Sequence, residues 1–216
     1  MLKLQLALDG ELSAALDILA ETRPHIDIAE VGTPLIYREG MRAVRKIRAL
    51  YPALTLLADL KIMDAGDLEA DIAFAAGADF VTVLGLANDA TIAGAAQAAR
   101  THGKRVMADM MQVADPLMRG RRLLALGCDA LCLHRAQDLQ ASQAAPYALL
   151  AELHRQLPEA QLAIAGGLTL DALPQILPCL PQIIIVGGAI TRTSDPATMA
   201  RRFAERIRNH EHSRVD

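Results

Sequence analysis

Tryptophan is absent from the sequence, and phenylalanine and tyrosine contribute only three residues each. Hydrophobic residues nevertheless make up 52% of the 216 positions, so the core must be built mainly from alanine, leucine, isoleucine and valine. Such a composition suits buried parallel strands that are covered by alanine-rich helices. No linker rich in proline, glycine or serine interrupts the chain, and we therefore expect one domain that spans residues 1–216.

The chain also lacks an excess of either charge, an even set of cysteines and a long apolar run. Its 22 basic and 25 acidic residues are interspersed, which argues against a nucleic-acid partner. Cys128, Cys132 and Cys179 are odd in number, as is typical of free thiols in a reducing compartment. The sequence shows no signal peptide and no stretch long enough to cross a bilayer. These absences predict a cytoplasmic protein without a membrane partner.

Short apolar runs recur along the chain, and each is followed by an amphipathic helical pattern. The predicted strands are residues 4–9, 26–31, 55–61, 80–84, 105–110, 130–134, 162–165 and 183–186. Alternation of eight strands with helices predicts an α/β fold, a closed (β/α)8 TIM barrel. The rival fold, an open doubly wound sheet, usually carries a Gly-x-Gly-x-x-Gly turn after its first strand. That turn is missing here, because the first strand runs into Leu-Asp-Gly-Glu at 8–11.

The carboxyl ends of the predicted strands are unusually polar, and in a barrel this is where catalytic groups gather. The polar residues at these ends are Asp9, Glu30, Asp59, Lys61, Asp109 and His134. A single acidic residue here could simply cap the following helix, but burial of so many charges without a task is costly. Because side chains alternate along a strand, Asp59 and Lys61 should share one face, and so should Cys132 and His134.

Two further features point to a site for an anion. In the segment 59–64, Lys61 follows a buried apolar run and is flanked by carboxylates that would hold it charged. The alternative is a solvated strand end in which Asp64 caps the next helix. The last two strands run into the glycine pairs Gly166-Gly167 and Gly187-Gly188, whose backbone N–H groups could hold a phosphate or could simply form tight turns.

The Asp59-x-Lys61-x-x-Asp64 motif, with Leu-Ala-Leu-Asp at 6–9 and Glu-Val-Gly-Thr-Pro at 30–34, resembles the orotidine 5'-phosphate decarboxylase suprafamily. Within it, the match is to the branch that contains 3-hexulose-6-phosphate synthase and 3-keto-L-gulonate-6-phosphate decarboxylase (KGPDC). The resemblance extends over nearly the whole chain. It implies a barrel of the ribulose-phosphate binding type and an enzyme that handles a Mg2+-bound 1,2-enediolate of a sugar phosphate.

The resemblance also implies a role for each residue. Glu30 and Asp59 would bind Mg2+, whose preferred ligands are carboxylate oxygens. Lys61 would donate to an enediolate oxygen, and Asp9 would orient substrate hydroxyls. The phosphate would be held by Gly166, Gly167, Gly187 and Gly188.

Three further roles follow from the same resemblance. His134 would move the proton, as histidine side chains can near neutral pH. Asp109 would bind a hydroxyl or relay a proton. Asp64 would reach into the active site of a neighbouring subunit, which implies a homodimer.

Two reactions fit these roles. The first is aldol condensation of formaldehyde with D-ribulose 5-phosphate to 3-hexulose 6-phosphate, and the second is decarboxylation of 3-keto-L-gulonate 6-phosphate to L-xylulose 5-phosphate. Asp109 and Gly188 favour the synthase, because the decarboxylase has glutamate and arginine at these places. Arg135 after His134 is instead similar to the decarboxylase, and it either contacts substrate or faces solvent. Arg192 could replace the missing phosphate-binding arginine.

Other readings remain for a barrel of this type. They are a non-catalytic sugar-phosphate binding barrel, a nucleotide-binding module, and decarboxylation of orotidine monophosphate itself. Retention of Lys61, His134 and both expected metal ligands argues against the two binding proteins. Glu30 and His134 argue against the third reading, because they point to a metal-dependent site.

Overall fold

The computed structural model describes residues 2–212, and its eight parallel strands close into a barrel in the order β1 to β8. The strands are β1 (Lys3–Leu8), β2 (Ile28–Val31), β3 (Thr55–Ile62), β4 (Phe80–Leu84), β5 (Arg105–Asp109), β6 (Ala130–His134), β7 (Gln161–Ala165) and β8 (Ile183–Val186). All eight predicted strands are confirmed, with ends that differ by at most two residues. β1 pairs with β8, so the barrel is confirmed and the open sheet is excluded.

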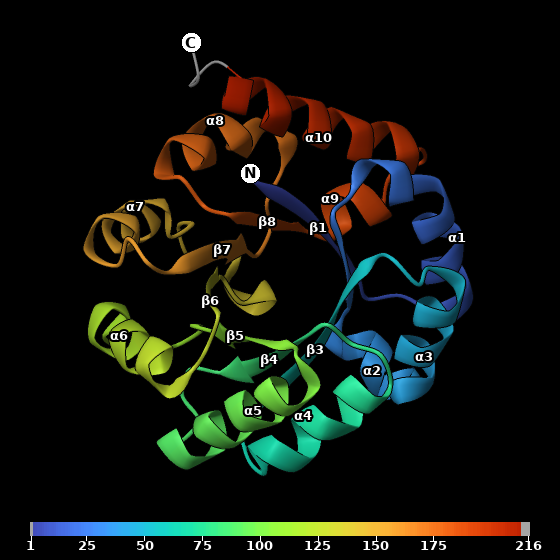
Figure 1. Cartoon of the computed structure of the whole chain (residues 1–216). Helices are drawn as coiled ribbons and strands as arrows, with labels where there is room; N and C mark the ends of the chain where they lie inside the picture. The colour runs from blue at the N-terminus through green and yellow to red at the C-terminus, as the bar shows by residue number, and fades with distance from the viewer. Residues whose placement is uncertain (1, 213–216) are drawn as a thin grey trace.

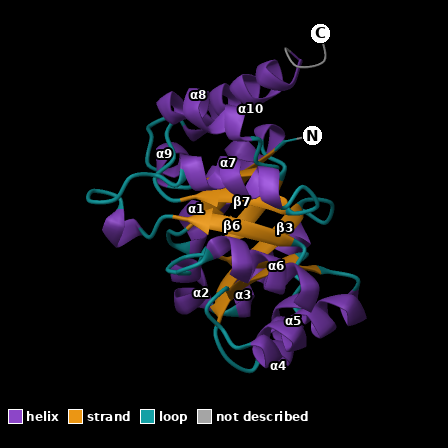
Figure 2. Ribbon diagram, turned by 90° about the vertical axis from the view of Figure 1, so that its left-hand side faces the viewer, coloured by secondary structure: helices purple, strands orange, loops and turns teal. Residues whose placement is uncertain are grey.

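Helices surround the strands as an outer ring (Figure 1) and lie on both sides of them in the perpendicular view (Figure 2). The α-helices are α1 (Leu12–Thr22), α2 (Thr33–Glu39), α3 (Met41–Leu50), α4 (Gly66–Ala75), α5 (Asp89–His102), α6 (Pro116–Leu126), α7 (Tyr147–Gln156), α8 (Leu173–Ile176), α9 (Gly188–Thr191) and α10 (Pro196–His212). Short 3-10 helices are η1 (Arg23–His25), η2 (Gln137–Leu139), η3 (Leu170–Ala172) and η4 (Leu177–Cys179). Within the described residues, none of these helices has the length and apolar character needed to span a bilayer.

The core has two layers, as the alternation of side chains in a barrel requires. The larger layer lies between strands and helices and is built mainly of alanine, leucine, isoleucine and valine. The smaller layer fills the barrel with Ala7, Ile28, Leu57, Phe80, Met107, Ala130, Cys132, Ala163, Ala165, Ile183 and Ile185. Phe80 is the one aromatic residue of this inner layer, and the guanidinium of Arg105 stacks 4.0 Å from the centre of its ring. The scarcity of aromatics therefore matches a narrow barrel filled by small side chains.

A repeated hydrogen bond joins the strands in pairs at the amino end of the barrel. The residue just before each even-numbered strand accepts the N–H of a residue near the start of the preceding strand. The pairs are Asp27 with Leu4, Asp79 with Leu56, Asp129 with Val106, and Gln182 with Leu162, at 2.6 to 2.9 Å. Each bond fixes the register of one strand against the next, far from the polar ends of the strands.

Asp79 is the most heavily used of these four residues, and we expect its removal to destabilise the fold. Burial would raise the pKa of Asp79, but Lys104, the Leu56 N–H and Arg48 together lower it below its usual value. The stabilisation is therefore present above the usual pKa of aspartate and is lost as the pH falls through the lower value in the folded protein. Asp79→Ala should lower the free energy of unfolding by about 2 kcal/mol at pH 7.

Urea denaturation at several pH values tests this expectation. The difference between wild type and Asp79→Ala should shrink as the pH falls toward about 3. Asp17→Ala, on the exposed side of α1, is the matched control and should change stability by less than about 0.5 kcal/mol. A loss of the same size in the control would show that Asp79 has no special part in stability.

Candidate active site

A cavity of about 630 Å³ opens at the carboxyl ends of the strands, within the size range of small-molecule sites. Most of the site residues that the sequence suggested line it. They are Asp9, Glu30, Asp59, Lys61, Asp109, His134, Gly166, Gly167, Gly187 and Gly188. The fold thus gathers side chains and loops from seven of the eight strands around one space.

Lys61 and Asp59 share a face, but a regular strand does not bring them together. Ala58 pairs with Val81 and Ile62 with Val83, so β3 bulges between these two pairs. Lys61 lies in the bulge with a left-handed backbone, at φ 49°. Its Nζ lies 2.5 Å from Asp59 Oδ2, whereas side chains two apart on a regular strand start about 7 Å apart. The bulge therefore folds the ammonium back onto the carboxylate.

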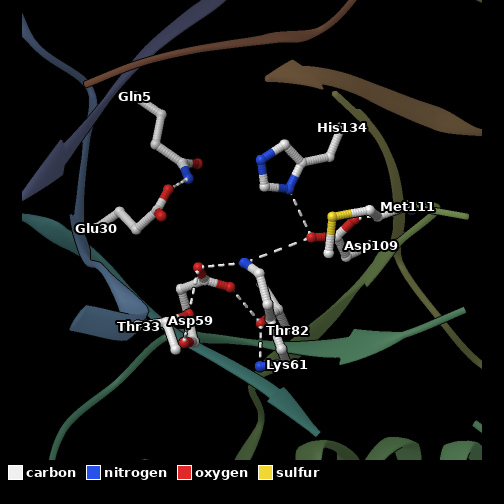
Figure 3. Close-up of polar contacts among 9 residues, drawn as sticks. All are labelled: Gln5, Glu30, Thr33, Asp59, Lys61, Thr82, Asp109, Met111 and His134. Atoms are coloured by element: carbon white, nitrogen blue, oxygen red, sulfur yellow. Dashed lines mark hydrogen bonds and ion pairs between the residues drawn. The ribbon is translucent and has the colours of Figure 1, made fainter. Parts of the chain in front are cut away.

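Lys61, Asp109 and His134 form a continuous polar chain across the mouth of the barrel (Figure 3). Lys61 Nζ lies 3.5 Å from Asp109 Oδ2, and His134 Nδ1 lies 2.8 Å from the same oxygen. The backbone N–H of Met111 donates to the other oxygen, at 3.0 Å. Figure 3 shows the second ring nitrogen of His134 facing the open space in front of Gln5 and Glu30. Asp109 thus orients the imidazole and leaves Nε2 free to meet a substrate.

The charges of this chain stabilise one another. Burial opposes the charge on Lys61, but the carboxylates of Asp59 and Asp109 outweigh it and raise the pKa of the ammonium above its usual value. Burial would raise the pKa of Asp109, but His134 and Lys61 lower it below its usual value. Both groups are therefore ionised at neutral pH, as an oxyanion partner and an orienting carboxylate must be.

Glu30 is buried and lacks a cation of its own. Its Oε2 accepts from Nε2 of Gln5 at 2.5 Å, and Gln5 is fully buried inside the barrel. Burial and the negative charge of Asp59 raise the pKa of Glu30 to about 8. A shift of that size shows that the space beside Glu30 and Asp59 is short of positive charge.

The donor set therefore fits a divalent cation with hard oxygen ligands, as Mg2+ is. Glu30 and Asp59 come from neighbouring strands, and both are buried at the floor of the cavity. Among residues 2–212, no three His, Cys, Asp or Glu side chains form a ready-made cage. This suits an ion that keeps several waters and is completed by substrate oxygens.

Glu30 gives a prediction that does not depend on activity. Its pKa is about 8 in the folded protein against 4.5 ordinarily, so unfolding releases a proton between these pH values. The contribution of Glu30 to stability is therefore full below pH 4.5 and is lost as the pH rises through about 8. Without divalent ions, Glu30→Gln should be more stable than wild type above that pH by on the order of a few kcal/mol, and nearly equal at low pH.

Urea denaturation in the presence of a chelator measures this difference across the pH range. Mg2+ in place of the chelator should stabilise wild type and leave Glu30→Gln unchanged, because only an ion that binds the folded state shifts the equilibrium. Parallel pH curves for the two proteins would contradict the raised pKa. Equal stabilisation by Mg2+ would exclude Glu30 as a ligand.

The glycine pairs shape the opposite wall of the cavity. Gly166 and Gly167 both have left-handed backbones, and a Cβ on Gly166 would lie 2.1 Å from the carbonyl oxygen of Arg135. In the turn after β8, the first N–H that donates back is that of Ile190, as expected where a helix starts with free N–H groups. Arg192 lies beside Gly188 and also lines the cavity.

Two of the suggested site residues lie outside the cavity. Arg135 donates to the carbonyl oxygens of Gly166 and Gln143, so its guanidinium braces the loops after β6 and β7 and does not line the space for substrate. It neither contacts the cavity nor simply faces solvent. Asp64 is exposed and accepts only the N–H of Ala65, at 2.8 Å. It does not cap α4, whose N-cap is Ala65.

The sequence did not reveal three polar residues that hold the site together, namely Gln5, Thr33 and Thr82. The hydroxyl of Thr33 lies 2.8 Å from Asp59 Oδ2, and that of Thr82 donates to Asp59 Oδ1 at 2.7 Å. Gln5 and Thr82 lie inside strands and not at their ends. The available signal was parity, because each lies two residues from an inward-facing side chain of its strand, Ala7 and Phe80.

Gly32 is needed because Asp9 lies against it. A Cβ at this position would be 2.0 Å from Asp9 Oδ1. The N–H of Gly32 donates to the carbonyl oxygen of Leu8, which ties the turn after β2 to the end of β1. The conformation of Gly32 is ordinary, with φ -65°, so close approach alone excludes a side chain here.

Comparisons with known proteins agree with this geometry. The family model described as Orotidine 5'-phosphate decarboxylase / HUMPS family matches residues 2–203. The chain is 42% identical over 207 residues to 3-hexulose-6-phosphate synthase of Bacillus subtilis, covering 95% of this chain and 99% of the relative.

Solved structures extend the likeness. The crystal structure of 3-hexulose-6-phosphate synthase from Salmonella typhimurium is 40% identical with a TM-score of 0.93, covering 97% of this chain and 100% of that one. KGPDC from Streptococcus mutans in complex with ribose 5-phosphate is 25% identical with a TM-score of 0.90, covering 96% and 98%.

Proposed function

Because the chain belongs to the orotidine 5'-phosphate decarboxylase / HUMPS family and is an enzyme of the lyase class, we propose that it condenses formaldehyde with D-ribulose 5-phosphate. The product is 3-hexulose 6-phosphate. The observation that carries the proposal is the chain of Lys61, Asp109 and His134 at the mouth of the cavity. It combines a cation for an oxyanion with an oriented imidazole, which is what formation of an enediolate needs.

His134 performs the proton transfers. Its Nε2 removes a proton from C1 of ribulose 5-phosphate, and the electron pair of that C–H bond forms the 1,2-enediolate. C1 then attacks the carbonyl carbon of formaldehyde, and the proton held on His134 goes to the former formaldehyde oxygen. No atom is left over, and C2 becomes the ketone at C3 of the product. Asp109 keeps Nδ1 protonated and so keeps Nε2 available as the base.

The negative charge that develops on the enediolate is met by residues that are already in place. Lys61 donates from Nζ to an enediolate oxygen, at no cost of reorganisation because Asp59 and Asp109 hold it. Asp9 accepts hydrogen bonds from substrate hydroxyls. Mg2+ held by Glu30 and Asp59 would supply further stabilisation of charge on the substrate oxygens.

The far end of the substrate fits the glycine wall. The N–H groups of Gly166, Gly167, Gly187 and Gly188 hold the phosphate, and Arg192 supplies the positive charge. Arg192 lies next to Gly188 in the cavity, which supports its use in place of the arginine that KGPDC carries there.

A second subunit would complete the site. Asp64 points away from its own cavity, and the nearby side chains of Met63, Leu68 and Ile72 are each about half exposed. These apolar side chains suit a protein contact around Asp64. In hybrids of Lys61→Ala and Asp64→Ala subunits, one wild-type site should form, so activity should recover on mixing. Failure to recover would count against a shared site.

The reaction is tested by supplying ribulose 5-phosphate with formaldehyde, and separately 3-keto-L-gulonate 6-phosphate, each with Mg2+ or with a chelator. We expect condensation with a kcat/KM at least about tenfold above that of decarboxylation, and loss of both in the chelator. Consumption of neither substrate would leave a non-catalytic sugar-phosphate binding barrel. Independence from divalent ions would remove the metal from the proposal.

Decarboxylation of 3-keto-L-gulonate 6-phosphate is the second candidate function. The fold likeness to KGPDC favours it, because the same enediolate arises when CO2 leaves. Asp109 and Gly188 weigh against it, since KGPDC has glutamate and arginine there. A faster decarboxylation than condensation would reverse the proposal.

A further inference from the structure

Thr82 lies in the middle of β4, and its side chain faces the interior of the barrel with 5% of its surface exposed. Its hydroxyl makes two hydrogen bonds, both to β3 (Figure 3). It donates to Asp59 Oδ1 at 2.7 Å, and it accepts the backbone N–H of Lys61 at 2.8 Å. One small side chain therefore contacts both residues of the charged pair, although it contributes no charge itself.

The hydrogen bond from Lys61 matters because this residue is strained. A left-handed backbone costs roughly 1 kcal/mol or more in a residue with a Cβ, and it persists only where the surroundings enforce it. The bulge removes Lys61 from the regular pairing of β3 with β4. Its N–H would be left buried without an acceptor if Thr82 did not supply one, and such a loss is costly. Thr82 therefore compensates for the bulge that aims the ammonium.

The two hydrogen bonds also constrain each other. A threonine hydroxyl has one proton, and here the proton is committed to Asp59 because the Lys61 N–H occupies the acceptor side. Asp59 Oδ2 in turn receives Lys61 Nζ. The result is a closed ring that runs from the Lys61 backbone through Thr82 and Asp59 to the Lys61 ammonium.

We propose that Thr82 is a positioning residue, which holds the Lys61 turn and the Asp59 carboxylate in the geometry that the reaction uses. The inference deepens the proposed function, since it rests on Lys61 and Asp59 acting there. A packing role makes a different prediction. Valine has nearly the shape of threonine, so a residue that merely fills the barrel could be replaced by valine without a selective effect on turnover.

The test compares Thr82→Val with Thr82→Ser and with Thr91→Val. Thr91 is another buried threonine, on α5 and outside the cavity, so its valine variant controls for loss of a buried hydroxyl. Thr82→Val should lower kcat by about 100-fold with less than about a threefold change in KM for ribulose 5-phosphate, because small misplacements of catalytic groups have effects of this size. Thr82→Ser should recover to within about fivefold of wild type, and Thr91→Val should stay within about twofold.

Amide hydrogen exchange at Lys61, followed by NMR, gives a readout that a packing role would not move. The Lys61 N–H should exchange at least about tenfold faster in Thr82→Val than in wild type, and Thr82→Ser should restore protection. If Thr82→Val does not fold, Thr82→Cys keeps the shape with a weak donor and acceptor, and it should show the same pattern to a smaller degree.

The outcomes separate the two proposals. A kcat for Thr82→Val within about twofold of wild type, or unchanged protection of the Lys61 N–H, would overturn the role of Thr82. Wild-type protein without condensation activity would contradict the proposed function alone. The exchange rates at Lys61 would then still support or overturn the hold of Thr82 on the turn.

Discussion

Replacement of Lys61 by alanine should lower kcat for the condensation by about 10³-fold and leave the barrel folded. The ammonium lies between two carboxylates, 2.5 Å from Asp59 Oδ2 and 3.5 Å from Asp109 Oδ2. A donor fixed in this way stabilises developing negative charge without reorganising. Removal of one such donor from an active site typically costs about 10² to 10³ in turnover, and Lys61 also carries a full charge.

The change should be visible in kcat more than in KM, because the enediolate bears a charge that the ground-state ketone lacks. Circular dichroism and thermal unfolding would verify that Lys61→Ala is folded. The inner layer and the outer layer of the core do not depend on the ammonium, so we expect the secondary structure to be retained.

Lys104→Ala is the matched control for Lys61→Ala. Lys104 also pairs with a carboxylate, 2.7 Å from Asp79 Oδ1, but it lies at the amino end of the barrel and outside the cavity. Its removal should reduce stability and leave kcat within about twofold of wild type. A kcat for Lys61→Ala within about tenfold of wild type would remove Lys61 from the mechanism.

The barrel could be predicted from the sequence because its strands are short apolar runs with sharp ends, and each end carries a polar residue. The same alternation correctly placed Cys132 in the inner layer and His134 at the cavity, two residues further along. The bulge at Lys61 could not be predicted. It depends on the pairing of β3 with β4 and on the Thr82 hydroxyl, which are tertiary features that the local sequence of β3 does not contain.

The role of Arg135 was misread for a related reason. An arginine directly after a catalytic histidine suggests a substrate contact, but a long side chain at the start of a loop can reach backbone carbonyls on either side. Here it reaches those of Gly166 and Gln143. The distribution of unpaired carbonyls near a loop is set by the folded chain, so the sequence cannot reveal which of the two uses applies.

His134→Ala should lower turnover by about 10² to 10⁴-fold, the range expected for loss of a general base. The effect should fall on the first chemical step. In D2O without formaldehyde, wild-type protein should exchange the C1 proton of ribulose 5-phosphate for deuterium, and His134→Ala should lose this exchange to the same extent as the condensation. NMR of the recovered substrate measures it directly. Added imidazole should restore part of the activity, since the cavity is open.

Asp109→Asn and His102→Ala sharpen this prediction. An asparagine at 109 can no longer hold Nδ1–H by a charged hydrogen bond, so activity should fall although the imidazole is still present. His102 pairs with Asp71 at 2.7 Å outside the cavity, and loss of that second His–Asp pair should leave the exchange unchanged. If His134→Ala kept C1 exchange but lost condensation, another group would be the base. His134 would then act only on the formaldehyde oxygen, because that is the one other proton transfer that the reaction contains.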